Sequence, residues 1–238
     1  MADGWPAHRS AGRAKPAQLA LDLAGEPSYG AEDFLIGPSN EDAYTLIESW
    51  PGWADPVLVL IGPEGSGKTH LAAIWASRSH AWRVPASAVT AQRVPELSSG
   101  GALVIEDCER GPQDEAALFH LLNLMRARAG GVILTARTAP NAWGLHTPDL
   151  ISRLRLAPSV RIQPPDDALL KAVLVKLFLD RQLIVDTGVI DAVALRIPRS
   201  FAQARAVVHA IDRASLERGR RVTRTFASEY ADQLAAAE

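Results

Sequence analysis

Wholly apolar runs and amphipathic stretches divide the chain into two parts. Before Pro164 and Pro165, short runs that are apolar at every position alternate with longer stretches whose apolar residues recur at helical spacing. After these prolines, only helical spacing remains. Strands that are apolar throughout are typical of a parallel sheet with helices on both faces. The pattern therefore predicts an α/β domain followed by a small all-helical lid domain.

The predicted elements follow from these two periodicities. Strands are expected at 57–61, 82–84, 102–105, 131–135 and 160–162. Helices are expected at 40–50, from His70 onward, and at 113–128, 150–156, 166–182, 188–195, 200–219 and 225–237. We place the α/β domain at 28–164 and the lid at 165–238, after a flexible N-terminal arm at 1–27 that is rich in Ala, Gly, Pro and basic residues.

Side-chain chemistry predicts several helix starts and one helix face. Ser39 or Asn40 is expected to cap the first helix and Thr225 the last, because their side-chain oxygens accept hydrogen bonds from free backbone amides. Ser200 and Gln203 form a capping box at the long lid helix. Apolar spacing in the helix at 113–128 predicts that these side chains face the sheet: Ala116, Leu118, Phe119, Leu122 and Met125.

Composition and charge narrow the classes of function. The single cysteine, Cys108, excludes a disulfide framework and favours a reducing compartment, so we expect a cytoplasmic protein. No apolar run approaches the length of a membrane span, and we expect no membrane partner. The net charge of −2 argues against direct DNA binding, and the arginine-rich segment 213–224 is interpreted as a solvated helix end.

The strongest chemical signal lies between the first predicted strand and the following helix. Eight residues match G-x-x-x-x-G-K-[ST]: Gly62, Pro63, Glu64, Gly65, Ser66, Gly67, Lys68 and Thr69. A loop of this kind directs backbone amides and the positive end of a helix at phosphate oxygens. Lys68 is expected to reach the β- and γ-phosphates and Thr69 to ligate Mg²⁺. The motif predicts a nucleotide-binding protein.

Two acidic residues and a threonine follow neighbouring predicted strands. Glu106 and Asp107 end one strand, where carboxylates hold Mg²⁺ and orient the attacking water in phosphoryl-transfer sites. Thr135 ends the next strand and is a candidate to contact the γ-phosphate or the water. The usual order places Asp first, and here Glu106 stands first. Because small displacements at such a site strongly reduce the rate, we expect sound nucleotide binding with weak or no intrinsic turnover.

In combination, these positions resemble the AAA+ ATPases, and within them the DnaA clade. Residues Asp33 to Asn40 resemble the N-terminal box of that clade, whose backbone contacts adenine, and this implies nucleotide contacts from Phe34, Leu35 and Ile36 and, after the phosphate loop, from His70. The resemblance further implies Walker A at Gly62 to Thr69, Walker B at Val104 to Asp107 and sensor I at Thr135. It assigns Arg153 as an arginine finger acting in trans and Arg199 as sensor II.

The layout of the chain resembles the DnaA-homologous regulators of the Hda type. The resemblance implies a negative regulator of chromosomal replication initiation that binds ADP or ATP with Mg²⁺ and stimulates hydrolysis of DnaA-bound ATP. Gln18 to Leu23 resembles the clamp-binding hexapeptide Q-L-x-L-x-L, with Gln18, Leu19, Leu21 and Leu23 as contacts for the sliding clamp, the β subunit of DNA polymerase III. DNA contact is then expected to be indirect, through the clamp. The sequence leaves open whether the chain forms a homodimer.

Two other interpretations remain open from the residues. A helicase loader or targeting factor of the same clade shares the nucleotide site but does not need a clamp hexapeptide. A stand-alone P-loop kinase or ATPase uses Arg153 and Arg199 within its own chain, and fast intrinsic turnover is its distinguishing property. The order of Glu106 and Asp107 and the hexapeptide in the arm argue against the second alternative.

Overall fold

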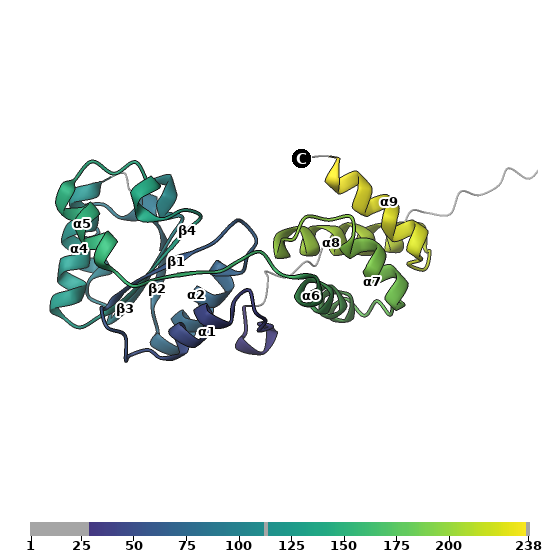
Figure 1. The fold of residues 1–238 in the computed structure, drawn as a ribbon, viewed down its shortest axis with the longest axis horizontal. Coiled ribbons are helices and arrows are strands. Elements are labelled where there is room, and N and C mark those ends of the chain that lie inside the picture. Colours follow the sequence, from purple (N-terminus) through teal and green to yellow (C-terminus); the bar gives the residue numbers. More distant parts are fainter. Residues whose placement is uncertain (1–28, 112–113, 237–238) are drawn as a thin grey trace, which may run out of the picture.

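The structure is a computed structural model that describes residues 29–111 and 114–236, and it contains an α/β domain and a helical lid side by side (Figure 1). In the described residues the sheet has five strands in the order β2-β3-β4-β1-β5, and every pairing is parallel. The strands are β1 (Val57–Ile61), β2 (Trp82–Pro85), β3 (Ala102–Glu106), β4 (Gly131–Ala136) and β5 (Ser159–Arg161). The fold class predicted from the hydrophobic pattern is confirmed.

Helices cover both faces of the sheet. The helices of the α/β domain are α1 (Glu41–Glu48), α2 (Lys68–Ser79), α3 (Val94–Leu97), α4 (Glu115–Ala127) and α5 (Pro148–Leu156). Strand β1 shows why its residues are all apolar, because Val57 and Val59 pack with α3, α4 and α5, whereas Leu58 packs with α1 and α2. Each face of the strand is therefore buried in a separate core.

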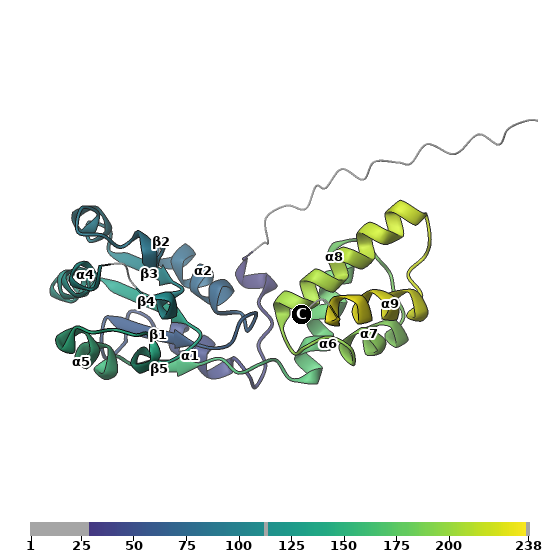
Figure 2. The same cartoon turned by 90° about the horizontal axis from the view of Figure 1, so that it is seen from above.

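The lid is a bundle of helices with its own core. Its helices are α6 (Asp167–Asp180), α7 (Thr187–Ala194), α8 (Phe201–Arg218) and α9 (Arg224–Ala235). The lid lies at one end of the α/β domain, and α4 and α5 lie at the other end in both views (Figures 1 and 2). No helix of the described residues is long and apolar enough to cross a membrane.

Three local predictions change in the structure. Ala116 is exposed, whereas Ala117 and Leu121 join the predicted Leu118, Leu122 and Met125 on the buried face of α4, which begins at Glu115 with Asp114 as its cap. The last helix is capped by Thr223 rather than Thr225, since the Thr223 hydroxyl accepts a hydrogen bond from the Phe226 amide at 3.3 Å. The first helix after the phosphate loop begins at Lys68, two residues before His70.

Candidate functional site

The phosphate loop connects the buried strand β1 to the N-terminus of α2. Gly65 has φ +69° and Gly67 has φ +100°, in the left-handed region that favours glycine, so the motif glycines let the loop close. Lys68 Nζ donates to the carbonyl oxygens of Gly62 and Pro63, both at 2.8 Å. The Ser66 hydroxyl is buried without a protein partner. Together with the free amides at the start of α2, these groups form a cradle for a phosphate.

The lid contacts the phosphate loop directly. The Phe201 amide, at the start of α8, donates to the Gly65 carbonyl oxygen at 2.7 Å. A Cβ atom at Gly65 would lie 2.0 Å from the Ser200 hydroxyl, which leaves no space for a side chain there. Ser200 caps α8 by accepting from the Gln203 amide, as the capping box predicted. The N-terminus of α8 is thus docked on the loop, so a ligand in the loop is in position to shift the lid.

Lys68 lies in a partly buried, strongly charged environment. Burial lowers the pKa of Lys68 below its ordinary value, and the nearby Glu109 carboxylate opposes that change. Arg137 bridges Glu64, at 2.7 Å, and Glu109, at 3.2 Å. Because these two carboxylates already neutralise Arg137, Lys68 is the cation of this group that can turn toward a bound phosphate.

The structure brings the predicted Walker B residues to the phosphate loop. Thr69 Oγ1 donates to Glu106 Oε2 at 3.1 Å, and the Asp107 amide lies 3.4 Å from Thr135 Oγ1. Asp107 has φ +58°, and its half-exposed carboxylate lies 3.9 Å from Arg110. These residues therefore gather at the carboxyl ends of β3 and β4, the edge from which α/β proteins bind ligands.

The fit of a magnesium ion to this arrangement is incomplete. Thr69 and Glu106 supply the hard oxygen atoms that Mg²⁺ prefers. However, the other carboxylate oxygen of Glu106 accepts two hydrogen bonds from Arg83, an arginine on β2. The single negative charge of Glu106 is therefore already neutralised by protein. The residues as they are arranged therefore do not fit Mg²⁺.

The segment that resembles the N-terminal box packs beside the loop. The Phe34 ring stacks on Tyr44, and the ring of His70 meets it edge-on at 5.2 Å. Burial lowers the pKa of His70, so the ring is neutral and its Nε2–H donates to the Gly30 carbonyl oxygen at 2.9 Å. The buried Asn40 side chain binds Gly37 N and Leu35 O. These contacts hold Phe34 next to Gly67 of the phosphate loop, whereas Leu35 is fixed through its carbonyl oxygen and Ile36 is half-exposed.

The two predicted arginines lie in different places. Arg199 lies two residues before Phe201, the lid residue bonded to the loop, and its guanidinium pairs with Asp167 at 2.9 Å. Arg153 lies on α5, is exposed, and has its guanidinium 5.1 Å from the centroid of the Phe119 ring. Helix α5 lies at the end of the α/β domain opposite the lid (Figure 1). Arg199 is thus near the phosphate loop only through its neighbours in the chain, and the helix that carries Arg153 lies away from the loop. Gln18 to Leu23 lie outside the described residues.

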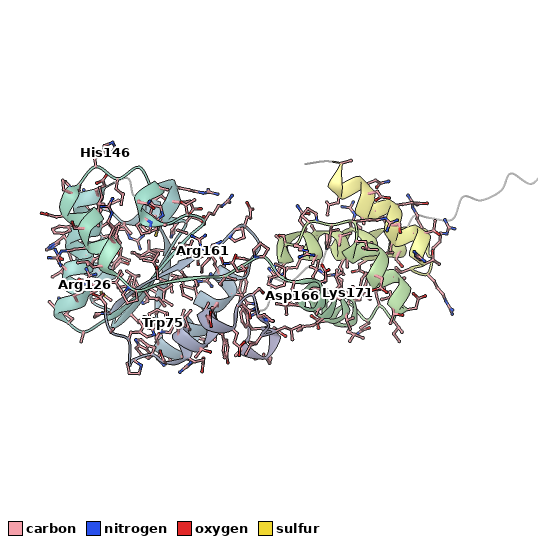
Figure 3. The ribbon with its side chains drawn as sticks, viewed as in Figure 1. Trp75, Arg126, His146, Arg161, Asp166 and Lys171 are labelled. Atoms are coloured by element: carbon pink, nitrogen blue, oxygen red, sulfur yellow. The ribbon has the colours of Figure 1, made fainter. Side chains whose placement is uncertain are left out.

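Glu115 fixes the start of the helix that carries Arg153. Its carboxylate accepts hydrogen bonds from the backbone amides of His146, at 2.9 and 3.1 Å, and Thr147, at 2.7 Å. Figure 3 places His146 at the end of the α/β domain away from the lid, which carries Lys171. Hydrogen bonding, mainly from Thr147, lowers the pKa of Glu115 from 4.5 to about 2. The ionised form therefore anchors α5.

This anchor predicts a pH-dependent loss of stability in Glu115→Gln. Because the folded-state pKa is depressed, Glu115 stabilises the protein above pH 4.5, and this stabilisation is lost as the pH falls toward about 2. The free energy of unfolding, measured by denaturant titration, should be lower in Glu115→Gln than in wild type at pH 7. The difference should shrink below pH 4.5. Glu229→Gln, at an exposed glutamate of α9, is the control; a difference independent of pH would contradict the assignment.

Arg83 is the site residue that sequence reasoning missed. It stands in a short strand with mostly exposed side chains, and no motif includes it. The register places Val84 beside Ile105, so Arg83 and Glu106 come together only once β2 is known to pair with β3. An exposed arginine in an edge strand, with an acidic residue ending another strand, was the available signal.

Comparison with known proteins adds to this geometry. No family model matches the chain. The crystal structure of domain III of the replication initiation protein DnaA from Thermotoga maritima superimposes with a TM-score of 0.75 at 19% sequence identity, covering 88% of this chain and 98% of that one. The protein has the DnaA-like AAA+ fold. AMPPCP-bound DnaA from Aquifex aeolicus also shares this AAA+ fold, with a TM-score of 0.68 at 18% identity over 81% of this chain and 67% of that chain.

Similarity to a DnaA protein is also found at the level of sequence. Chromosomal replication initiator protein DnaA 2 of Chlamydia caviae is 28% identical in an alignment of 167 residues that covers 58% of this chain. The match spans 36% of that relative, so this AAA+ chain corresponds to about a third of its length. The sequence similarity therefore agrees with the DnaA-like AAA+ fold.

Proposed function

We propose that the protein is a negative regulator of replication initiation that promotes hydrolysis of ATP bound to DnaA. The observation that carries this proposal is the position of Arg153 on α5, at the end of the α/β domain away from its own phosphate loop and lid. An arginine so placed is exposed to a second protein. In this proposal, Arg153 contacts the nucleotide bound by a partner protein and not the nucleotide bound by its own chain.

The phosphate loop supports binding of ADP or ATP. Its amides, Lys68 and the buried Ser66 hydroxyl provide the groups that hold phosphates. The related DnaA of Aquifex aeolicus binds AMPPCP, an adenine nucleotide analogue, which favours adenine for this chain. The docking of Phe201 on Gly65 would report the bound nucleotide to the lid, with Arg199 two residues from the contact. In this proposal the bound nucleotide sets the conformation, and its turnover is not required.

Arg153 would act on the partner's ATP by charge stabilisation. The guanidinium is always charged and presents a rigid fork of donors that matches phosphate oxygens. In hydrolysis of ATP, negative charge spreads over the transferred phosphoryl group, and an arginine supplied in trans stabilises it. The Phe119 ring and the anchored start of α5 hold Arg153 in an exposed position. In contrast to Arg153, Asp107 and Thr135 would act at the nucleotide site of this chain itself.

Docking on the sliding clamp would bring the regulator to DNA without direct DNA contact. The proposal assigns this role to Gln18, Leu19, Leu21 and Leu23, with Gln18 in a polar pocket and the leucines in an apolar groove of the clamp. Ordering a short segment costs conformational entropy, so the affinity of the hexapeptide should be modest and increased by avidity. A net charge of −2 is consistent with indirect contact with DNA.

The direct test is the rate of hydrolysis of DnaA-bound ATP. Labelled ATP on DnaA is followed after addition of this protein, with and without DNA-loaded clamp. Clamp-dependent acceleration is the expected result. No acceleration in the presence of ADP and loaded clamp would contradict the regulator proposal and favour a helicase loader of the same fold.

The double replacement Leu21→Ala and Leu23→Ala should weaken clamp binding about 100-fold or more. Each leucine loses roughly 1.5–3 kcal/mol of apolar burial in the groove, and 1.4 kcal/mol corresponds to a factor of ten in affinity. Surface plasmon resonance on immobilised clamp measures the change. Affinity for ADP should not change, because the phosphate loop is untouched. Replacing Leu216, an exposed leucine of α8, by alanine is the control, and wild-type affinity for the clamp in the double variant would refute the hexapeptide assignment.

A further inference from the structure

Arg83 holds the Glu106 carboxylate from the neighbouring strand. Its Nε and Nη2 atoms donate to the same carboxylate oxygen, Glu106 Oε1, at 3.0 and 2.6 Å. The second oxygen, Oε2, accepts from Thr69 Oγ1 at 3.1 Å. Both oxygens of this carboxylate are therefore bonded to protein donors at the phosphate loop.

Aromatic packing and partial burial keep Arg83 in this position. Its guanidinium carbon lies 5.6 Å from the centroid of the Tyr29 ring, and that ring packs edge-on against His70 at 5.4 Å. The side chains of Arg83 and Glu106 are 33% and 20% exposed, so water screens their attraction only in part. Arginine does not lose its proton in proteins, so the positive charge is permanent.

A divalent cation and Arg83 compete for the same carboxylate. Mg²⁺ binds carboxylate oxygens at about 2.0–2.1 Å in near-octahedral geometry. A guanidinium on Oε1 would then stand beside the ion, and like charges at such separations repel strongly in a partly buried site. Lys68 lies in the loop itself and can bind the phosphate while Arg83 stays paired with Glu106.

We propose that Arg83 takes the place of a divalent cation at Glu106, so that the phosphate loop binds a nucleoside diphosphate with an affinity that does not depend on Mg²⁺. This inference rests on the nucleotide binding of the proposed function. Arg83 is a positioning residue that neutralises Glu106, so that this carboxylate does not repel the bound diphosphate. The chain then retains its nucleotide whether or not the metal is present. This agrees with the proposed function, in which the ATP that is hydrolysed is bound to DnaA.

The experiment is a titration of the full chain with fluorescent mant-ADP, once in EDTA and once in excess Mg²⁺. For wild type, the two dissociation constants should agree within about twofold. For Arg83→Gln, affinity in EDTA should fall about tenfold, the effect expected for one charge-assisted interaction, and Mg²⁺ should restore most of it. Arg78→Gln is the matched control, because Arg78 lies on α2 and pairs with Glu48 away from the phosphate loop.

Three outcomes would overturn the inference. If wild type binds mant-ADP tenfold more weakly in EDTA than in Mg²⁺, its nucleotide binding needs the metal. If the ratio of the two dissociation constants is the same in Arg83→Gln as in wild type, Arg83 does not replace the metal. Absence of mant-ADP binding in both buffers would reject the nucleotide site of the proposed function, and this inference with it. The comparison of wild type between the two buffers involves no substitution, so it decides the question even if Arg83→Gln does not fold.

Discussion

Arg153→Ala is expected to return the rate of hydrolysis of DnaA-bound ATP to the rate of DnaA alone. An arginine supplied in trans contributes about 10³–10⁵ to the rate of phosphoryl transfer in related reactions, so this is the largest effect that any single side chain of the protein should show. The measurement is a single-turnover assay of DnaA-bound ATP with loaded clamp present. Binding to the clamp, measured separately, should be unchanged.

Arg155→Ala is the matched control for this experiment. Arg155 is two residues further along α5 and is also exposed, so its loss removes the same charge from the same helix. It should leave the stimulation intact. Arg153→Lys tests the chemistry further: a lysine keeps the charge but lacks the planar fork, and it should restore only a small part of the rate. Full stimulation by Arg153→Ala would reject Arg153 as the residue acting in trans.

Lys68→Ala should lower the affinity of the chain for ADP and ATP by about 100-fold or more. Hydrogen bonds to charged groups contribute roughly 1.5–3 kcal/mol each, and Lys68 is expected to exchange its bonds to Gly62 O and Pro63 O for bonds to phosphate oxygens of the nucleotide. Bound phosphates add negative charge near the ammonium group, which raises its lowered pKa and keeps it charged. Isothermal titration calorimetry with ADP measures the change.

The control for Lys68→Ala is Lys171→Ala. Lys171 lies on α6 of the lid and pairs with Asp191, so the same replacement is made away from the loop. It should bind ADP as wild type does. Unchanged ADP affinity in Lys68→Ala would show that the phosphate loop of this chain does not carry its nucleotide, and the regulator would then act without one.

The contact between the lid and the phosphate loop bears on the predictions for both Lys68→Ala and Arg153→Ala. Because the Phe201 amide is bonded to the Gly65 carbonyl oxygen, a nucleotide that reshapes the loop also shifts the start of α8. Arg153 lies on the opposite side of the α/β domain, so nucleotide binding and the action on DnaA use different surfaces of the same rigid sheet. Arg153→Ala should therefore abolish stimulation without changing the affinity for ADP.

Errors in the predicted elements have local physical causes. Ala116 and Ala117 are equally apolar, and only the position of the Asp114 cap decides which of them faces the sheet. Thr223 and Thr225 are both good caps, and the backbone after Gly219 selects the first. Strand β2 has mostly exposed side chains, yet its position was predicted, because Trp82 and Val84 lie between two well-defined elements.

The sequence by itself determined the α/β domain with its helical lid and the phosphate loop. Strands buried on both faces must be apolar at every position, and the loop depends on glycines at positions with positive φ, so both signals lie in contiguous residues. Only the tertiary structure decided that Arg83 holds Glu106, that Phe201 docks on Gly65, and that α5 carries Arg153 away from the loop. Each of these depends on strand order and domain packing, which bring together or separate residues that are distant in the chain.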